Sequence, residues 1–223
     1  MTDLGVDLAG MPLANPLMTA SGCAANGREL HRFFDIATLG AFVTKSVKAA
    51  PMSGRGTPRM AETAGGMLNS IGLQGPGIDA FVATDLPWLA TVGARVLVSI
   101  AGGDSAEFAR VARTLAAAPD WGCVAGIEVN ISCPNVANRG LVFACDPGSS
   151  AEVLSAVRAV VPCGTKLFAK LSPDVTDLVP IAAAALAAGA DGLTMINTVL
   201  GMAIDTERLR PHLLSVAYRL TGV

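Results

Sequence analysis

The stretch 127-IEVNISCPN-135 decides the fold of this chain. Strand-forming residues run as far as Asn130, and Cys133 then stands between a serine and a proline, with Asn135 two residues further on. In α/β proteins the side chains that meet a ligand follow the carboxyl ends of parallel strands. A thiol and two amides in this place therefore predict a buried strand that ends in a functional loop.

Six short β-rich runs, each ending in polar or Gly/Pro residues, alternate with helix-like segments. The runs are Leu17–Thr19, Ala41–Val47, Arg95–Ile100, Gly126–Ile131, Lys166–Leu171 and Gly192–Ile196. Asp104–Ala118 and Ser149–Val161 both open with the pattern of a capping box, and Asp177–Ala188 ends at Gly189, which suits a helix C-terminus. This alternation predicts a parallel sheet covered by helices.

Two α/β architectures fit this alternation: an open doubly wound sheet and a (β/α)8 TIM barrel. Functional residues gather at one switch point in an open sheet, whereas they follow many different strands in a barrel. Polar residues follow every run here: Ser21, Lys45–Ser46, Ser99, Asn130–Cys133, Lys170–Ser172 and Asn197–Thr198. This distribution favours the barrel. About six of the eight βα units fit, so residues 1–223 are expected to form a single, incomplete barrel domain.

Two further segments and the two histidines carry predictions. Lys48–Gly77 is rich in Gly, Pro and Met and has weak periodicity, so we expect a long functional loop there. Arg210–Val223 is expected to form one further helix. His31 and His212 are both expected to lie on helices.

Composition narrows the class of protein. Of the 223 residues, 52% are hydrophobic, 15% are charged and 4% are aromatic, with a net charge of −2. These values exclude a disordered chain and argue against a nucleic-acid or anionic-membrane surface. Five scattered cysteines without a CxxC pair indicate neither a zinc site nor a disulfide framework, so no metal is expected. Without a leader or an apolar span of membrane length, the protein is expected to be cytoplasmic.

Cys133 and two lysines are candidates for chemistry. Cys133 is either a buried small hydrophobic residue or, given the amides around it, a proton acceptor. A Cys–His nucleophile pair is not favoured, because both histidines are expected on helices rather than near Cys133. Lys45 and Lys170 each follow a strand. They either snorkel to the rim or face an anionic ligand or a cofactor that gains negative charge, such as a reduced flavin.

Four asparagines lie near predicted strand ends or in candidate loops. Singly, an asparagine beside Ser or Thr is more often a turn residue. An amide also offers a donor and an acceptor together without adding charge. Combined with the thiol and the lysines, the set would suit a flat heterocycle that bears a carboxylate; its members are Asn69, Asn130, Asn135 and Asn197.

These residues lie in segments that resemble the dihydroorotate dehydrogenase family. The segments, in the family's order, are NPLMTASGC, VTKSV, TPRMAETAGGMLNSIGLQGPG, IEVNISCPN, AKLSPDVTD and AAGADGLTMINTVLGM. The likeness runs from about Asn15 to Asp205 and is nearest to the class 1 catalytic subunits that work with NAD. Six ordered motifs make this resemblance specific.

The resemblance implies an FMN-binding (β/α)8 barrel that oxidises (S)-dihydroorotate to orotate in pyrimidine (UMP) biosynthesis. It implies that Cys133 is the catalytic base and that Lys45 lies between FMN and the substrate. The implied substrate-binding residues are Lys45, Asn69, Ser70, Ile71, Gly72, Leu73, Asn130, Asn135, Asn197 and Thr198. The implied cofactor-binding residues are Ser21, Lys45, Ser46, Ser99, Asn130, Lys170 and Ile196.

Some features depart from the family pattern. Ser99 and Gly75 each stand where the family usually has an asparagine, and a serine has the shorter reach. Family members continue through two more βα units, whose glycine-rich loops hold the FMN phosphate. Two alternatives therefore stay open: a shortened, inactive remnant that acts only through a partner chain, and another FMN-barrel pyrimidine reductase.

The resemblance also implies a partner. In the NAD-linked class, electrons leave FMN for a second subunit that carries FAD and an iron–sulfur cluster. This chain has neither a GxGxxG fingerprint nor a four-cysteine ligand set, so those groups would come from that subunit. A homodimer core within a heterotetramer is the expected assembly.

Overall fold

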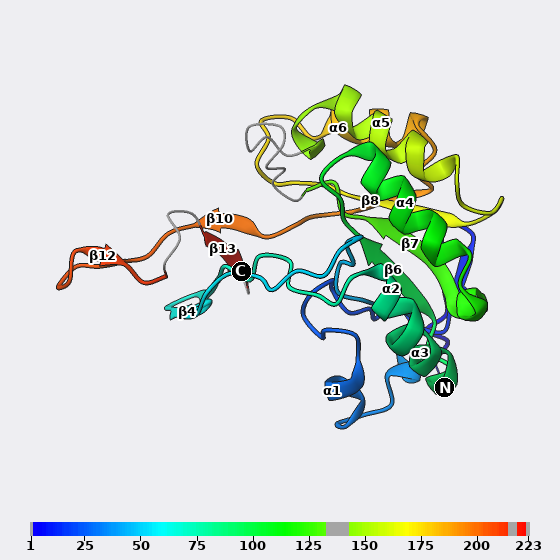
Figure 1. Cartoon of the computed structure of the whole chain (residues 1–223), viewed down its shortest axis with the longest axis horizontal. Coiled ribbons are helices and arrows are strands. Elements are labelled where there is room, and N and C mark those ends of the chain that lie inside the picture. The colour runs from blue at the N-terminus through cyan, green and yellow to red at the C-terminus, as the bar shows by residue number, and fades with distance from the viewer. Residues whose placement is uncertain (1, 133–142, 214–217, 222–223) are drawn as a thin grey trace.

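A five-stranded parallel sheet, in the order β3-β6-β7-β8-β9, forms the centre of the computed structural model (Figure 1). The structure describes residues 2–132, 143–213 and 218–221. The strands are β3 (Phe42–Val43), β6 (Val96–Ile100), β7 (Val124–Val129), β8 (Lys166–Lys170) and β9 (Gly192–Thr194). A parallel bridge between Met18 and Ala41 adds the first predicted run beside β3. Five of the six β-rich runs therefore contain a strand of one curled sheet that forms part of a TIM barrel, and the first run contributes a single bridge to it.

Helices cover the outer face of this sheet. They are α3 (Leu86–Val92), α4 (Ser105–Ala116), α5 (Pro147–Arg158) and α6 (Val179–Ala187). Alternate strand residues, such as Val98 and Ile127, are fully buried in one core together with the apolar faces of these helices. The remaining short helical elements are α1 (Arg28–His31), η1 (Ile36–Thr38), α2 (Ile78–Ala80), η2 (Phe81–Asp85), η3 (Pro119–Cys123) and η4 (Phe143–Cys145).

Side-chain caps fix where the two long helices start. The Asp104 carboxylate accepts a hydrogen bond of 2.7 Å from the Glu107 N–H, as the capping pattern predicts. The second helix begins earlier than predicted, because the Asp146 carboxylate accepts a hydrogen bond of 2.7 Å from the Ser149 N–H. This bond is also the main cause that lowers the pKa of Asp146. Gly189 follows α6 at φ +104°, which confirms it as the C-terminal stop.

The inner face of the sheet is apolar at the amino ends of its strands. A hairpin of β1 (Val6–Leu8) and β2 (Met11–Leu13) closes that end. Met11 and Leu13 are buried in one cluster with Val43, Leu97 and Phe168. Water is therefore excluded from this end of the half-barrel.

A second sheet stands apart from the parallel sheet, on the left in Figure 1, in the order β10-β13-β5-β4. Its strands are β10 (Val199–Gly201), β13 (Tyr218–Thr221), β5 (Gly66–Asn69) and β4 (Met60–Thr63). A separate hairpin joins β11 (Ile204–Asp205) to β12 (Arg210–Pro211). The segment predicted as a long loop thus contains the β4–β5 hairpin.

The predicted helix over Arg210–Val223 is wrong in the part that the structure describes. Residues 210–211 pair with β11, and 218–221 pair with both β5 and β10. His212 follows β12 and is not helical, whereas His31 lies in α1 as predicted. Local apolar periodicity favoured a helix, but pairing with strands distant in sequence satisfies the backbone hydrogen bonds instead.

Among the described residues, no helix combines the length and the apolar character that crossing a membrane requires.

Candidate active site

Polar side chains take over at the carboxyl ends of the central strands. Ser99 and Glu128 lie in β6 and β7, Asn130 follows β7, and Lys170 ends β8. Ser99 stands two residues beyond Leu97, and Lys170 two beyond Phe168, so these polar residues share the inner face with the apolar cluster. All four polar residues are buried, with 5% or less of each exposed. Buried polar groups in such numbers require partners.

Three hydroxyl groups form a chain that leads to a carboxylate. The Ser99 Oγ donates to Glu128 Oε1 at 2.9 Å. Since that uses its only hydrogen, the Ser46 Oγ, 2.9 Å away, must donate to Ser99. The Ser21 Oγ, 3.2 Å from Ser46, must then donate in turn. Because Glu128 Oε1 accepts the first hydrogen bond, it fixes the direction of every hydrogen bond in the chain.

Lys170 brings a positive charge to the same carboxylate. Its Nζ lies 3.7 Å from Glu128 Oε1, and the two side chains are only 7% and 3% exposed. Removing one partner of such a buried pair leaves an uncompensated charge, which typically costs about 3–5 kcal/mol. The two residues thus form one electrostatic unit in the interior of the half-barrel.

Amide groups extend the network toward β9. The Asn130 Nδ2 donates to Ser46 Oγ at 2.9 Å, and its Oδ1 accepts from Ser132 Oγ at 2.8 Å. The Asn197 Nδ2 donates to Ser132 Oγ at 2.6 Å. The Asn197 Oδ1 accepts from the Thr198 N–H at 2.8 Å. These bonds determine which way each amide is turned.

The structure brings several of the predicted site residues into this one network: Ser21, Ser46, Ser99, Asn130, Lys170, Asn197 and Thr198. Ser99, a departure from the family pattern, is fully buried and uses its hydroxyl hydrogen on Glu128. The shorter serine side chain thus uses its only hydrogen within the protein and keeps its lone pairs as acceptors.

Other predicted residues lie outside the described contacts of this network. Lys45 is half-buried after β3, and its backbone N–H donates to Ala25 O at 2.9 Å. Ile196 is 41% exposed. Asn69–Leu73 belong to the end of β5 and the following loop, where Gly72 and Leu73 have φ of +76° and +51°. Cys133 and Asn135 lie outside the residues that the structure describes.

Two members of the network, Glu128 and Ser132, received no site role from the sequence, although Ser132 lies within the polar stretch Asn130–Cys133. Glu128 was taken as part of an apolar strand, although an acidic side chain between Ile127 and Val129 in a buried strand needs a cation nearby. Lys170 at the end of the next strand is the signal that could have identified the pair. Ser132 gave no comparable signal, because serine is common after strands.

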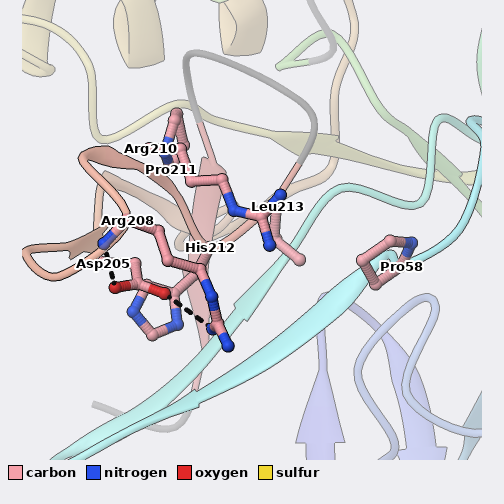
Figure 2. A pocket seen from close by; sticks show the side chains of 7 residues that line it. All are labelled: Pro58, Asp205, Arg208, Arg210, Pro211, His212 and Leu213. Atoms are coloured by element: carbon pink, nitrogen blue, oxygen red, sulfur yellow. Dashed lines mark hydrogen bonds and ion pairs between the residues drawn. The ribbon is translucent and has the colours of Figure 1, made fainter.

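A separate hollow lies on the β11–β12 hairpin (Figure 2). Its lining residues are Pro58, Asp205, Arg208, Arg210, Pro211, His212 and Leu213. The Arg208 N–H and guanidinium both bond to Asp205, at 2.9 and 3.0 Å, and the backbone bond is the main cause that lowers the pKa of Asp205. These charges satisfy each other locally, so the strand-end network is the stronger candidate for an active site.

Polar groups at the carboxyl ends of curled parallel strands, above a closed apolar layer, define a barrel enzyme of the (β/α)8 class. Comparison with known proteins narrows this class. The family model described as dihydroorotate dehydrogenase matches residues 3–217. The chain belongs to the dihydroorotate dehydrogenase family, a family of flavin-dependent oxidoreductases, which confirms the resemblance seen in its motifs.

Relatives support this assignment along the whole chain. The chain is 47% identical over 220 residues to the dihydroorotate dehydrogenase B (NAD(+)) catalytic subunit of Geotalea daltonii, covering 99% of this chain and 70% of that protein. It is 46% identical over 222 residues to the protein of the same name from Geobacillus kaustophilus, covering 100% and 69%. The chain therefore spans about 70% of the length of such relatives.

A solved structure supports the fold. The crystal structure of DHODH in complex with ferulenol from Eimeria tenella superposes with a TM-score of 0.70 at 20% sequence identity. The match covers 94% of this chain and 62% of that one. At this identity the likeness concerns the fold, and it agrees with an incomplete set of βα units.

Proposed function

We propose that this protein oxidises (S)-dihydroorotate to orotate in de novo pyrimidine biosynthesis, with FMN as its bound cofactor and NAD as the final acceptor. Membership of the dihydroorotate dehydrogenase family supports the reaction class. The observation that carries the proposal is the strand-end network. It holds one buried ammonium group and two oriented amides on one inner face.

The residues of this network fit a flavin. A flavin becomes more negative when it is reduced, and the ammonium of Lys170 lies buried where it could balance that charge. Ser21, Ser46 and Asn130 surround the same position with hydroxyl and amide groups that suit the polar edge of a heterocycle. When bound, the flavin would supply the acceptor for a hydride from the substrate.

The chain's own residues would hold the substrate and move one proton. Cys133 would remove the proton from C5 of dihydroorotate, since a thiolate is a sufficiently strong base at neutral pH. Asn130 and Asn197, together with Asn135 and Thr198, would hold the pyrimidine ring and its carboxylate in line with that sulfur. Lys45 and the backbone of Asn69–Leu73 would complete the pocket. Ser99 and Ile196 would contact the cofactor.

A partner subunit belongs to the same proposal. The relatives are named catalytic subunits, which supports a second chain. We propose that residues 1–223 form a single barrel domain within a homodimer core. Two electron-transfer subunits carrying FAD and an iron–sulfur cluster would complete a heterotetramer in the cytoplasm. The substrate would be dihydroorotate and the product orotate.

The experiment that tests the function uses the purified full chain. We expect visible flavin absorption after reconstitution with FMN, and formation of orotate from dihydroorotate with an artificial electron acceptor. A colourless chain that binds no FMN would contradict the proposal and favour an inactive remnant. Turnover of uracil-type dihydropyrimidines, but not of dihydroorotate, would instead identify another pyrimidine reductase.

A further inference from the structure

We propose that Glu128 is a positioning residue for the flavin site: it holds the ammonium of Lys170 in place and sets the direction of the Ser99–Ser46–Ser21 hydroxyl chain. This inference rests on the proposed function, because it concerns the same site. Neither the sequence motifs nor the family likeness assigned a role to Glu128. Its position in the middle of the network is the observation that carries the proposal.

Because Glu128 is buried, its charge acts strongly on the groups around it. Its side chain is 3% exposed, so solvent cannot screen its charge effectively. A buried carboxylate requires a cation and hydrogen-bond donors, and here Lys170 and Ser99 provide them. Lys170 depends on Glu128 in the same way. If the Glu128 carboxylate did not attract its ammonium group, the flexible Lys170 side chain could turn outward to solvent.

One oxygen atom of Glu128 contacts both Ser99 and Lys170. Glu128 Oε1 lies 2.9 Å from Ser99 Oγ and 3.7 Å from Lys170 Nζ. The same oxygen therefore serves both partners. Neutralising Glu128 would act at the same time on the lysine and on the two serines further along the chain.

A matched control joins the segment after β3 to helix α4. Lys48 and Glu107 form a second Lys–Glu pair with Nζ and Oε1 3.8 Å apart, and their side chains are 21% and 18% exposed. Glu107 bonds to the backbone N–H groups of Gly103 and Ala49 rather than to the hydroxyl chain. Glu107→Gln therefore changes a similar charge pair and leaves the network intact.

The first measurement needs no flavin. Trace acylation of lysines in the full chain, followed by mass spectrometry, compares Lys170 in the parent, Glu128→Gln and Glu107→Gln proteins. We expect Lys170 to be modified several-fold faster in Glu128→Gln, and at the parent rate in Glu107→Gln. Circular dichroism and the unfolding midpoint verify that each variant is folded. Equal Lys170 rates in folded parent and Glu128→Gln proteins would overturn the proposal.

The second measurement is the midpoint potential of bound FMN. Removing the negative charge of Glu128 alone would raise the potential, whereas displacement of the ammonium lowers it. If Glu128 holds Lys170 in place, both charges leave the site in Glu128→Gln, so its potential should match that of the Glu128→Gln/Lys170→Met double variant. A Glu128→Gln potential that lies clearly above both the parent and the double variant would show that Lys170 stays in place, and would overturn the proposal. A parent chain that binds no FMN contradicts the proposed function instead, and the acylation result still decides the role of Glu128.

Discussion

The two ends of the half-barrel's inner face differ sharply, although the same strands form both. At the amino ends, Leu97 and Phe168 pack with the β1–β2 hairpin. Two residues further along each strand, Ser99 and Lys170 join a polar network. The two ends belong to the same strands, so the difference arises from which side chains each strand presents to the inner face. One end is a closed apolar layer, and the other carries the polar groups of the candidate active site.

The largest expected effect is on catalysis at the polar end. Cys133→Ser should slow dihydroorotate oxidation about 10²–10⁴-fold, because a serine is a far poorer base at neutral pH. FMN binding and the unfolding midpoint should stay unchanged. Steady-state assays with orotate detection measure the rate, and Cys163→Ser, at an exposed cysteine, is the control. Full activity in Cys133→Ser would remove this thiol from the mechanism.

The apolar end should respond in stability rather than in chemistry. Phe168→Ala should lower the free energy of unfolding by about 3–5 kcal/mol, the usual cost of a cavity left by a buried aromatic ring. Phe33→Ala, at a residue that is 85% exposed, should have little effect. Urea denaturation followed by circular dichroism measures both. Similar losses in the two variants would show that the β1–β2 hairpin does not close this end.

A smaller kinetic effect is expected from Lys170→Ala. It should slow flavin reduction by roughly tenfold, which corresponds to the loss of one charge-assisted interaction. Stopped-flow absorbance of the flavin measures this step. Lys48→Ala, in the other Lys–Glu pair, is the matched control. Unchanged reduction kinetics in Lys170→Ala would refute its assigned role.

The smallest effect concerns a charge beside the apolar end, at Asp191. Burial alone would raise the pKa of Asp191, but hydrogen bonds from the Leu167 N–H and Arg158, together with the charges of Arg158 and Lys166, lower it overall. A carboxyl whose pKa is lowered on folding stabilises the fold above its unfolded pKa of about 4, and this contribution is lost as the pH falls.

Asp191→Asn should therefore be less stable than the parent at neutral pH and approach it below about pH 4. Unfolding midpoints measured between pH 3 and pH 7 check this (the range brackets an unfolded aspartate pKa of about 4). Asp79→Asn, at an exposed aspartate, is the control. A stability difference that does not change with pH would mean that the charge of Asp191 is not responsible.

Much of the central sheet could be predicted from the sequence, because its strands are buried. In β6 all five residues are buried, so apolar content and length identify the strand without knowledge of its partners. The helix that follows Asp104 was equally readable, since its cap is local. Features that depend only on residues close together in the chain can therefore be predicted from the sequence.

The second sheet could not be predicted for the opposite reason. Its strand over 218–221 pairs with β5, about 150 residues earlier in the chain. Leu200, in β10, is 51% exposed, so apolar content there does not indicate burial. The network likewise depends on contacts between different strands, and Glu128 could be understood only beside Lys170. Interactions between distant segments leave little trace in local pattern.

The hydroxyl chain has a consequence for what its outer end can offer to another molecule. The hydrogens of Ser99, Ser46 and Ser21 are each engaged with the next oxygen toward Glu128. Ser21, the last serine of the chain, is therefore left with lone pairs alone on the side away from Ser46. A group that meets this end must bring its own hydrogen, so the carboxylate selects for a donor from three hydroxyl groups away.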